Sequence, residues 1–174
     1  MTKHVIAILV QCLLCASVHA AGLTFTTPDG WQKVPTSSSM RVADFSLPRA
    51  TGDVEDAELV LYYFAGSGGG VDANLQRWLG QMQQPDGRPS RLRAKKQTRT
   101  VNGLAVTLLD VSGTYVAELS PGTSVRHNKP NFRLRAAVIQ TPRGPYYIKL
   151  TGPKKTVAQW TRSFDQFVAS LRFE

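Results

Sequence analysis

Residues 97–109 read QTRTVNGLAVTLL, two runs of strand-forming residues on either side of Asn102-Gly103. Asparagine and glycine accept the positive φ angles that a two-residue turn requires, so this stretch predicts a tight β-hairpin. A second hairpin is expected where Pro142-Arg143-Gly144-Pro145 separates the runs 132–140 and 146–150. Hairpins join antiparallel strands, so the sheet is predicted to be mainly antiparallel.

Two amphipathic helices are expected outside this pair of hairpins. The first follows a glycine-rich run and ends near residues 85–87. Its apolar stripe at helical spacing is formed by Val71, Leu75, Trp78, Leu79 and Met82. The second helix is expected over residues 156–170, close to the end of the chain. Its stripe is formed by Val157, Trp160, Phe164, Phe167, Val168 and Leu171.

Further strands are predicted before the first helix. Residues 40–47 alternate between apolar and polar side chains, and residues 59–64 are apolar on both faces, as in a central strand that is covered on two sides. The sequence therefore predicts an α+β protein with a helix on each face of the sheet, an α/β/α sandwich. Arg133 and Arg135 alternate with apolar residues, which predicts one solvated face at that end of the sheet.

A resemblance follows from this layout. The motif Pro28-Asp29-Gly30-Trp31, the glycine-led helix with Asn74 and Arg77-Trp78, and the stretch Tyr147-x-Lys149-Leu150-Thr151-Gly152-Pro153 resemble uncharacterised exported bacterial proteins. Those proteins are in turn similar to the PsbP-like superfamily. The resemblance covers most of the chain and implies an α/β/α sandwich with an accessory or binding role. The metal and photosystem contacts of PsbP have no matching motif in this chain.

The first twenty residues have the layout of a secretory signal peptide. An apolar run at residues 5–10 follows a short basic start, and Val18 and Ala20 occupy the small-residue positions that a signal peptidase reads. The run is too short to span a membrane, which takes about 20 residues, and no later segment is suitable. Cleavage after Ala20 would leave residues 21–174 as one domain, so we expect a periplasmic or secreted protein.

Both cysteines, Cys12 and Cys15, lie inside this leader. A lipid anchor at one of them is the alternative, but Gln11 and Leu13-Leu14 precede them where lipoprotein signals have small residues. The mature chain would contain no thiol, which excludes disulfides and cysteine metal sites. Its one imidazole would be that of His127.

Positive charge is concentrated in residues 88–99 of a chain that carries 21 lysines and arginines against 12 acidic residues. Such a stripe attracts acidic envelope polymers or an acidic protein surface. Nucleic acid is not expected, because the protein is exported and no aromatic residue in the stripe could stack on bases. The alternative is a charged edge strand protected from pairing with other chains. The residues assigned to a partner-binding surface are Arg91, Arg93, Lys95 and Lys96.

The glycine run before the first helix is a candidate anion site. Gly68, Gly69 and Gly70 would let an anion approach the backbone amides at a helix N-terminus. No nucleotide-binding motif is completed, and Asp72 is expected to cap the helix and to repel an anion. The alternative is a flexible crossover from strand to helix.

Two other hypotheses assign chemistry to this chain. Ser67 lies in a sequence close to a nucleophile elbow, and Asp110 and His127 follow in the chain order of an α/β-hydrolase, although antiparallel hairpins do not suit that fold. An acidic stretch lacks the spacing of an EF-hand but would offer oxygen ligands to calcium, with a solvated loop as the alternative. Its residues are Asp53, Glu55, Asp56 and Glu58.

The leading hypothesis is a non-catalytic, exported binding or accessory module. It assigns no catalytic residue, no cofactor and no metal, and its partner is a protein or an acidic envelope component. A small serine hydrolase centred on Ser67 and a calcium-dependent adhesion module are the alternatives.

Overall fold

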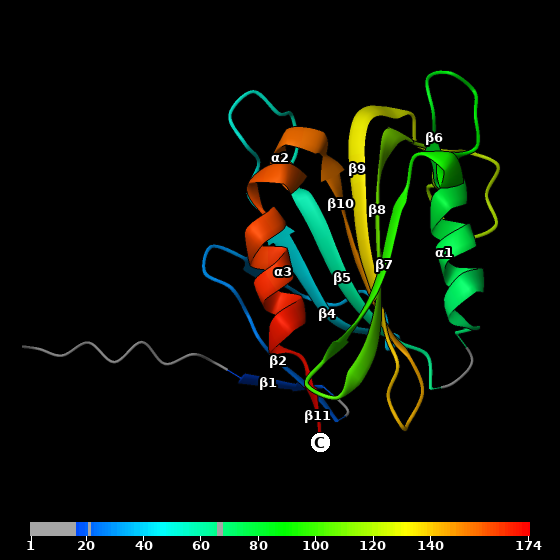
Figure 1. Ribbon diagram of the computed structural model, residues 1–174. Coiled ribbons are helices and arrows are strands. Elements are labelled where there is room, and N and C mark those ends of the chain that lie inside the picture. Colours follow the sequence, from blue (N-terminus) through cyan, green and yellow to red (C-terminus); the bar gives the residue numbers. More distant parts are fainter. Residues whose placement is uncertain (1–16, 21, 66–67) are drawn as a thin grey trace, which may run out of the picture.

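An eight-stranded antiparallel sheet forms the centre of the computed structural model, which describes residues 17–20, 22–65 and 68–174 (Figure 1). The strand order is β3-β4-β5-β10-β9-β8-β6, and β7 also pairs with β8. The strands are β3 (Gln32–Val34), β4 (Arg41–Leu47), β5 (Ala57–Tyr63), β6 (Met82–Gln83), β7 (Lys95–Val101), β8 (Leu104–Tyr115), β9 (Lys129–Ile139) and β10 (Tyr146–Pro153). The central place of β5, between β4 and β10, confirms the prediction from its two apolar faces.

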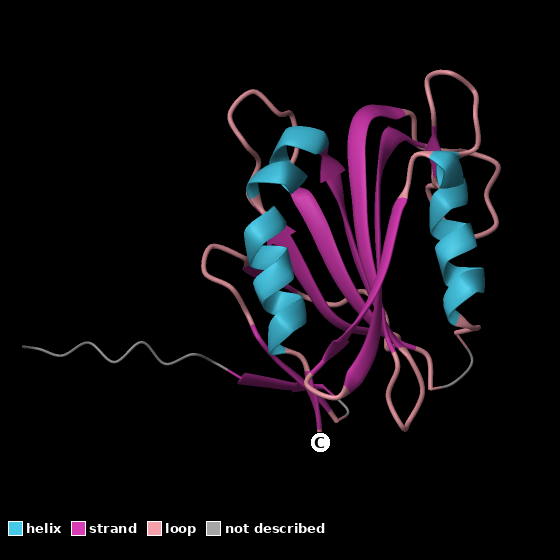
Figure 2. Cartoon of the chain, in the orientation of Figure 1, coloured by secondary structure: helices cyan, strands magenta, loops and turns pink. Residues whose placement is uncertain are grey.

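Helices cover both faces of this sheet (Figure 2). Helix α1 (Val71–Gly80) lies on one side, and α2 (Lys154–Gln159) and α3 (Thr161–Ser170) lie on the other. The predicted α+β class and α/β/α layering are therefore confirmed. Two bounds were wrong, since α1 ends before residue 85 and the C-terminal helix is interrupted at Trp160. The indole of Trp160 donates a hydrogen bond to the carbonyl of Pro48 (2.8 Å), and this anchor lies at the break.

A separate small sheet lies beside the main one and was not predicted as such. It contains β1 (Ser17–Ala20), β2 (Leu23–Thr26) and β11 (Arg172–Phe173), in the order β1-β2-β11. The pairing of β2 with β11 joins the two ends of the chain. No local pattern specifies this contact, because its partners are far apart in the sequence.

The predicted hairpins are confirmed. Asn102 and Gly103 have φ angles of +48° and +83°, and Val101 pairs with Leu104 across the turn between β7 and β8. Strands β9 and β10 form the second hairpin, in which Ile139 pairs with Tyr146.

The sheet separates two apolar clusters. On the side of α2 and α3, Phe167 packs against Phe25 and Trp31, with both ring centroids 5.0 Å away. On the side of α1, Leu75 and Trp78 pack in a cluster with residues from β8, β9 and β10. Leu75 and Trp78 of the predicted stripe are therefore buried on α1, Val71 and Leu79 are partly buried, and Met82 belongs to β6.

The prediction of a solvated face at Arg133 and Arg135 was wrong. Arg135 is 9% exposed, donates a hydrogen bond to Asp165 of α3 (2.9 Å) and lies over the ring of Phe164 at 4.6 Å. Arg133 donates to Asp110 of β8 (2.8 Å). The alternation was interpreted as exposure, but α3 covers these two arginines through contacts with Thr161, and carboxylates of α3 and β8 pair with them.

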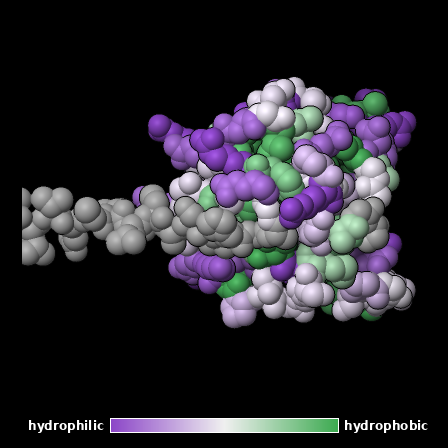
Figure 3. Space-filling view, turned by 90° about the horizontal axis from the view of Figure 1, so that it is seen from below, coloured by the Kyte–Doolittle hydropathy of each residue, from purple (hydrophilic) through white to green (hydrophobic). Residues whose placement is uncertain are grey.

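The surface has no broad apolar region on the face that Figure 3 shows, where hydrophobic residues are interspersed with hydrophilic ones. Exposed large apolar side chains include Met40, Val54 and Leu92 on separate segments, and Leu119 and Val125, which are joined by a backbone hydrogen bond (3.0 Å) in the segment after β8. Within the described ranges, no helix has the length and apolar character needed to cross a membrane.

Candidate functional site

A polar cleft with a volume of about 740 Å³ opens beside α1. Helix α1 packs against β6 and β8, so it covers only part of its face of the sheet. The cleft lies over the remainder, where Tyr62 of β5 and Lys149 of β10 meet Arg77 and Gln81 at the end of α1. The segment 115–127, which follows β8, completes the lining.

Strand register places Lys149 in this cleft. Lys149 pairs with Val60 of β5, which pairs with Asp44 of β4, so the three residues form one cross-strand row. Neighbouring Ile148 and Leu150 point to the opposite face and are fully buried in the cluster beneath α2 and α3. The alternation of a central strand therefore directs one lysine out of an apolar run and toward α1.

The ammonium group of Lys149 is held by neutral partners. It donates hydrogen bonds to Oε1 of Gln81 (2.7 Å) and to the hydroxyl of Tyr115 (3.0 Å). The pKa of Lys149 is lowered to about 8, mainly by burial; Glu58 opposes this shift, and Arg77 and Arg41 contribute to it. The charged form is therefore less favourable here than in water.

Tyr115 fixes one wall of the cleft. Burial, with added contributions from Glu58 and Tyr62, raises the pKa of Tyr115 to about 12, so its hydroxyl is neutral at pH 7. Its ring stacks on that of His127, with 5.4 Å between centroids. The segment that carries His127 is attached to α1 through a hydrogen bond from the amide of Val116 to the carbonyl of Gln81 (2.8 Å).

The cations of the cleft differ in their partners. Arg41 forms ion pairs with Asp44 (2.9 Å) and Glu58 (3.1 Å). Arg126 pairs with Glu118 at 3.5 Å. Arg77 donates to the side-chain oxygen of Asn74. Within the part of the chain that the structure describes, neither Arg77 nor Lys149 has a carboxylate within the 4.0 Å of a salt bridge.

This arrangement suits the binding of an acidic group. Arg77 and Lys149 form no salt bridge with an acid of the described chain, and Tyr115 and Gln81 are neutral hydrogen-bonding groups beside them. A cleft of this volume lies within the usual range for small-molecule sites, about 300–1,000 Å³. No cluster of three or more metal-ligating side chains occurs among residues 17–20, 22–65 and 68–174.

The glycine run supports the aromatic residues beside α1. The side-chain amide of Asn74 donates to the carbonyls of Gly68 (2.7 Å) and Gly70 (3.0 Å), and the hydroxyl of Tyr147 donates to that of Gly69 (2.6 Å). A β-carbon at Gly68 would lie 2.6 Å from the ring of Phe64, so this position requires glycine for close packing.

The prediction that Asp72 caps helix α1 was wrong. Gly70 occupies the N-cap position of α1, without a side-chain hydrogen bond, and Asp72 lies in the first turn. Its carboxylate accepts a hydrogen bond from the ammonium of Lys96 (3.0 Å). The predicted helix start was too late by two residues, because glycine can begin a helix without a side-chain acceptor.

The basic residues of segment 88–99 do not gather around one site. Arg93 pairs with Asp86 (2.9 Å) and Lys96 pairs with Asp72, both at the surface. Lys95 and Lys96 belong to β7, which pairs with β8 alone among the described strands. The exposed, basic strand β7 thus has the position that the edge-strand interpretation requires.

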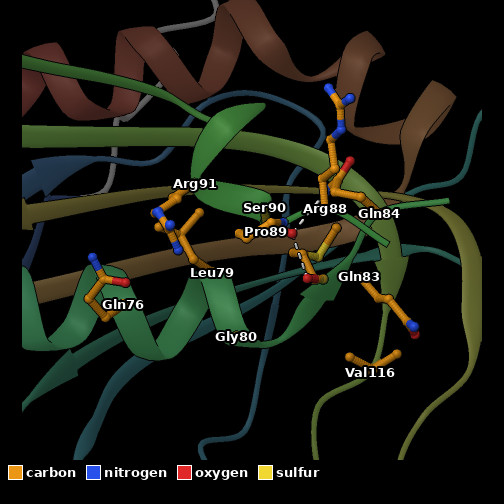
Figure 4. Close-up of a pocket in the computed structure, with 11 residues that line it drawn as sticks. Gln76, Leu79, Gly80, Gln83, Gln84, Arg88, Pro89, Ser90, Arg91 and Val116 are labelled. Atoms are coloured by element: carbon orange, nitrogen blue, oxygen red, sulfur yellow. Dashed lines mark hydrogen bonds between the residues drawn. The ribbon is translucent and has the colours of Figure 1, made fainter. Parts of the chain in front are cut away.

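Arg91 lines a different pocket, of about 380 Å³, beside the end of α1. Figure 4 shows the side chains of Arg88 and Arg91 projecting in different directions there. The hydroxyl of Ser90 donates to the carbonyl of Met82 (2.6 Å) and accepts from the side-chain amide of Gln84 (2.9 Å). These buried polar groups are satisfied by one another, so a ligand in this pocket would have to bind the other polar side chains of the lining, such as Arg88 and Arg91.

The structure describes two of the three residues of the hydrolase hypothesis, Asp110 and His127. Ser67 lies outside the described residues. Asp110 accepts hydrogen bonds from Arg133, and His127 stacks on Tyr115 in the cleft. Among the described residues no hydrogen bond joins Asp110 to His127.

The four acidic residues of the calcium hypothesis bind separate partners. Asp53 accepts from the amide of Thr156 (2.8 Å), and Asp56 accepts from Ser46 (3.1 Å). Glu55 pairs with Lys129, and Glu58 pairs with Arg41 in the cleft. Their carboxylates are therefore used in joining segments of the fold.

The residues of the cleft were not predicted as a site. Tyr62, Arg77, Tyr115 and Lys149 come from four elements that only the fold brings together. One signal was available, since Lys149 is the single charged residue of the run 146–150. A lysine within a central strand is uncommon unless its charge has a partner.

Solved structures with similar folds are known. Three of them are PA94, a protein of unknown function from Pseudomonas aeruginosa, the cyanobacterial PsbP (CyanoP) of Synechocystis, and LpqN, which is involved in cell envelope biogenesis of Mycobacterium tuberculosis. Their TM-scores are 0.50, 0.53 and 0.51, at 17%, 11% and 12% sequence identity. They cover 91%, 97% and 90% of this chain, and the matches cover 96%, 98% and 88% of the respective structures. No protein-family model and no curated protein sequence matches this chain.

The chain therefore has a PsbP-like fold, an α/β/α sandwich that was expected from the resemblance of its sequence. At these identities the similarity concerns the fold alone.

Proposed function

We propose that this protein is an exported, non-catalytic binding module and that the polar cleft is its ligand-binding site. The observation that carries the proposal is Lys149, a partly buried ammonium group with neutral hydrogen-bond partners in an open cleft. Burying an ammonium group without an opposite charge costs stability. Groups with a perturbed pKa in a cleft are common at functional sites, and a ligand with an acidic group would compensate the charge.

The contacts of two polar groups support a role without turnover. Asp110 is paired with Arg133, and the raised pKa of Tyr115 makes its hydroxyl a poorer acid than that of an exposed tyrosine. The similarity to a PsbP protein and to LpqN supports an accessory role in or near the cell envelope. The ligand is accordingly held and released without chemical change.

Export rests on the leader at residues 1–20. Cleavage after Ala20 would remove β1 but would leave β2 paired with β11, so the mature chain would retain the contact between its ends. The main sheet would lose no strand, because β1 pairs only with β2 among the described strands.

Native mass spectrometry tests the export and the binding together. We expect the full chain, expressed with its leader in a bacterial host, to be recovered outside the cytosol with the mass of residues 21–174. Incubated with a small-molecule extract of the envelope of the source cells, it should retain a ligand that is released chemically unchanged. Lys149→Met should lose this adduct, whereas Lys155→Met, a change on the exposed face of α2, should keep it. Full-length protein in the cytosol would disprove the export, and an empty wild-type protein or a converted ligand would disprove the binding role.

The basic edge strand is a second candidate surface, for an acidic envelope component or protein. The exposed side chains of β7 favour it, because they present positive charge next to an unpaired strand edge. We expect charge reversal of four residues to abolish binding to immobilised acidic envelope polysaccharide and, in the wild type, salt to weaken that binding. The four changes are Arg91→Glu, Arg93→Glu, Lys95→Glu and Lys96→Glu.

A control with the same net charge separates a local effect from a general one. It reverses four exposed basic residues outside segment 88–99, namely Lys33, Arg49, Lys155 and Arg162. If the control loses as much binding as the variant with four changes in residues 91–96, or if that variant binds like the wild type, this basic segment is not the contact surface.

A further inference from the structure

The cleft continues into a second recess with aromatic walls. This recess has a volume of about 210 Å³ and shares Tyr62, Arg77, Gln81 and Lys149 with the cleft. Its other lining residues are Phe64, Trp78 and Tyr147. Charged and aromatic surfaces therefore meet at Arg77 and Lys149, which belong to both cavities.

The aromatic walls are held in place by packing. Trp78 and Tyr147 are 4% and 1% exposed, and their rings meet edge to face with 6.4 Å between centroids. Phe64 lies 5.4 Å from Tyr147 and stacks on Tyr62 at 5.7 Å. The hydroxyl of Tyr147 is bound to the glycine loop at Gly69 (2.6 Å). A ligand would thus meet apolar side chains that folding has already ordered, so binding would not have to immobilise them.

The charges at the mouth of the recess favour one negative charge on the ligand. Arg77 and Lys149 form no salt bridge with a carboxylate of the described chain. In contrast, Arg41 has two carboxylate partners and Arg126 has one. Glu58 and Glu118 line the same cleft and would repel a second negative charge. A monoanion is accordingly better matched than a dianionic phosphate.

The size of the recess favours a compact apolar body. An apolar cavity of about 150 Å³ in another protein binds benzene, so a recess of 210 Å³ has room for one ring or a short branched chain. Aromatic rings also pack favourably edge to face and offset against such walls.

We propose that the ligand of the cleft is a small monocarboxylic acid with an aromatic or compact apolar body. Its carboxylate pairs with Lys149 and Arg77, and its body occupies the recess between Phe64, Trp78 and Tyr147. This inference rests on the proposed binding role of the cleft and specifies the chemical class that it takes.

Isothermal titration of residues 21–174 with four probes tests the ligand class. The probes are 3-phenylpropionate, its neutral amide, acetate and phenyl phosphate. We expect 3-phenylpropionate to bind, and its amide to bind about tenfold or more weakly because the charge-assisted hydrogen bonds are lost. Acetate should also bind about tenfold or more weakly, because it leaves the recess empty. Phenyl phosphate should bind less tightly than the carboxylate.

Variants locate the two halves of the ligand. Arg77→Gln should weaken 3-phenylpropionate binding about tenfold, whereas Arg162→Gln, on the exposed surface of α3, should leave it unchanged. Phe64→Leu keeps an apolar side chain and should weaken 3-phenylpropionate about threefold without changing the affinity for acetate. Thermal unfolding of each variant checks that the fold is retained.

Several results would overturn the inference. Equal binding of the acid and its amide would refute the carboxylate contact, and equal binding of acetate and 3-phenylpropionate would refute the recess. Tighter binding of phenyl phosphate would assign the cleft to phosphate esters. If none of the probes binds, the ligand class is wrong, while a ligand retained in native mass spectrometry would still support the proposed binding role.

Discussion

Replacing Lys149 by methionine is expected to make the protein more stable while weakening binding of an acidic ligand about tenfold or more. Methionine fills a similar volume and needs no hydrogen bonds, so it removes the cost of keeping an ammonium group in the cleft. The fall in the pKa of Lys149 from 10.5 to about 8 sets the scale of this cost. At pH 7 we expect a gain of about 1–3 kcal/mol in the free energy of unfolding, measured by denaturant titration.

The gain should depend on pH in a defined direction. Between pH 8 and 10.5 the unfolded chain keeps the Lys149 proton that the folded protein has released. The stability of the wild type therefore rises with pH in this window relative to the variant, and the difference between them should be largest below pH 8 and vanish near pH 10.5. Lys155→Met should change stability by no more than about 0.5 kcal/mol at any of these pH values. A Lys149→Met protein that is less stable than the wild type at pH 7 would contradict the argument.

Replacing Asp110 by alanine is expected to destabilise the fold by about 2–4 kcal/mol. Asp110 accepts hydrogen bonds from Arg133 and also lies 3.6 Å from the guanidinium of Arg135. Hydrogen bonding to Asp110 raises the pKa of Arg133. A guanidinium group is not deprotonated in proteins even without such a partner, so both arginines stay charged after the substitution. Truncation would leave the two partly buried guanidinium groups with one carboxylate, that of Asp165. Urea denaturation should show a lower midpoint with an unchanged slope.

Two further variants make this expectation specific. Asp86→Ala removes the exposed partner of Arg93 and should leave the stability nearly unchanged, because an exposed ion pair contributes little. Adding Arg133→Met to Asp110→Ala should recover part of the lost stability, because the uncompensated charge is removed with its partner. Equal effects of Asp110→Ala and Asp86→Ala would mean that the buried network contributes no more than a surface pair.

The local elements of this protein could be predicted because their signals lie within a few residues. Asn102-Gly103 specifies its turn through the φ angles that both residues accept. Leu75 and Trp78 specify the buried face of α1 through their spacing alone. The central position of β5 followed from its two apolar faces.

The alternation at Arg133 and Arg135 led to a wrong prediction, because a polar residue on a strand can face either water or a carboxylate. The carboxylate of Asp165 lies thirty residues away in the sequence, on a helix that folds back over the strand. A pattern within the strand itself contains no information about that partner.

The sequence by itself determined the class of the fold, since turns and apolar periodicities are properties of neighbouring residues. Only the tertiary structure decided the site, because Tyr62, Arg77, Tyr115 and Lys149 meet through strand register and the packing of α1. The tertiary structure also gave Lys149 its lowered pKa, since that shift depends on burial and on charges from other elements.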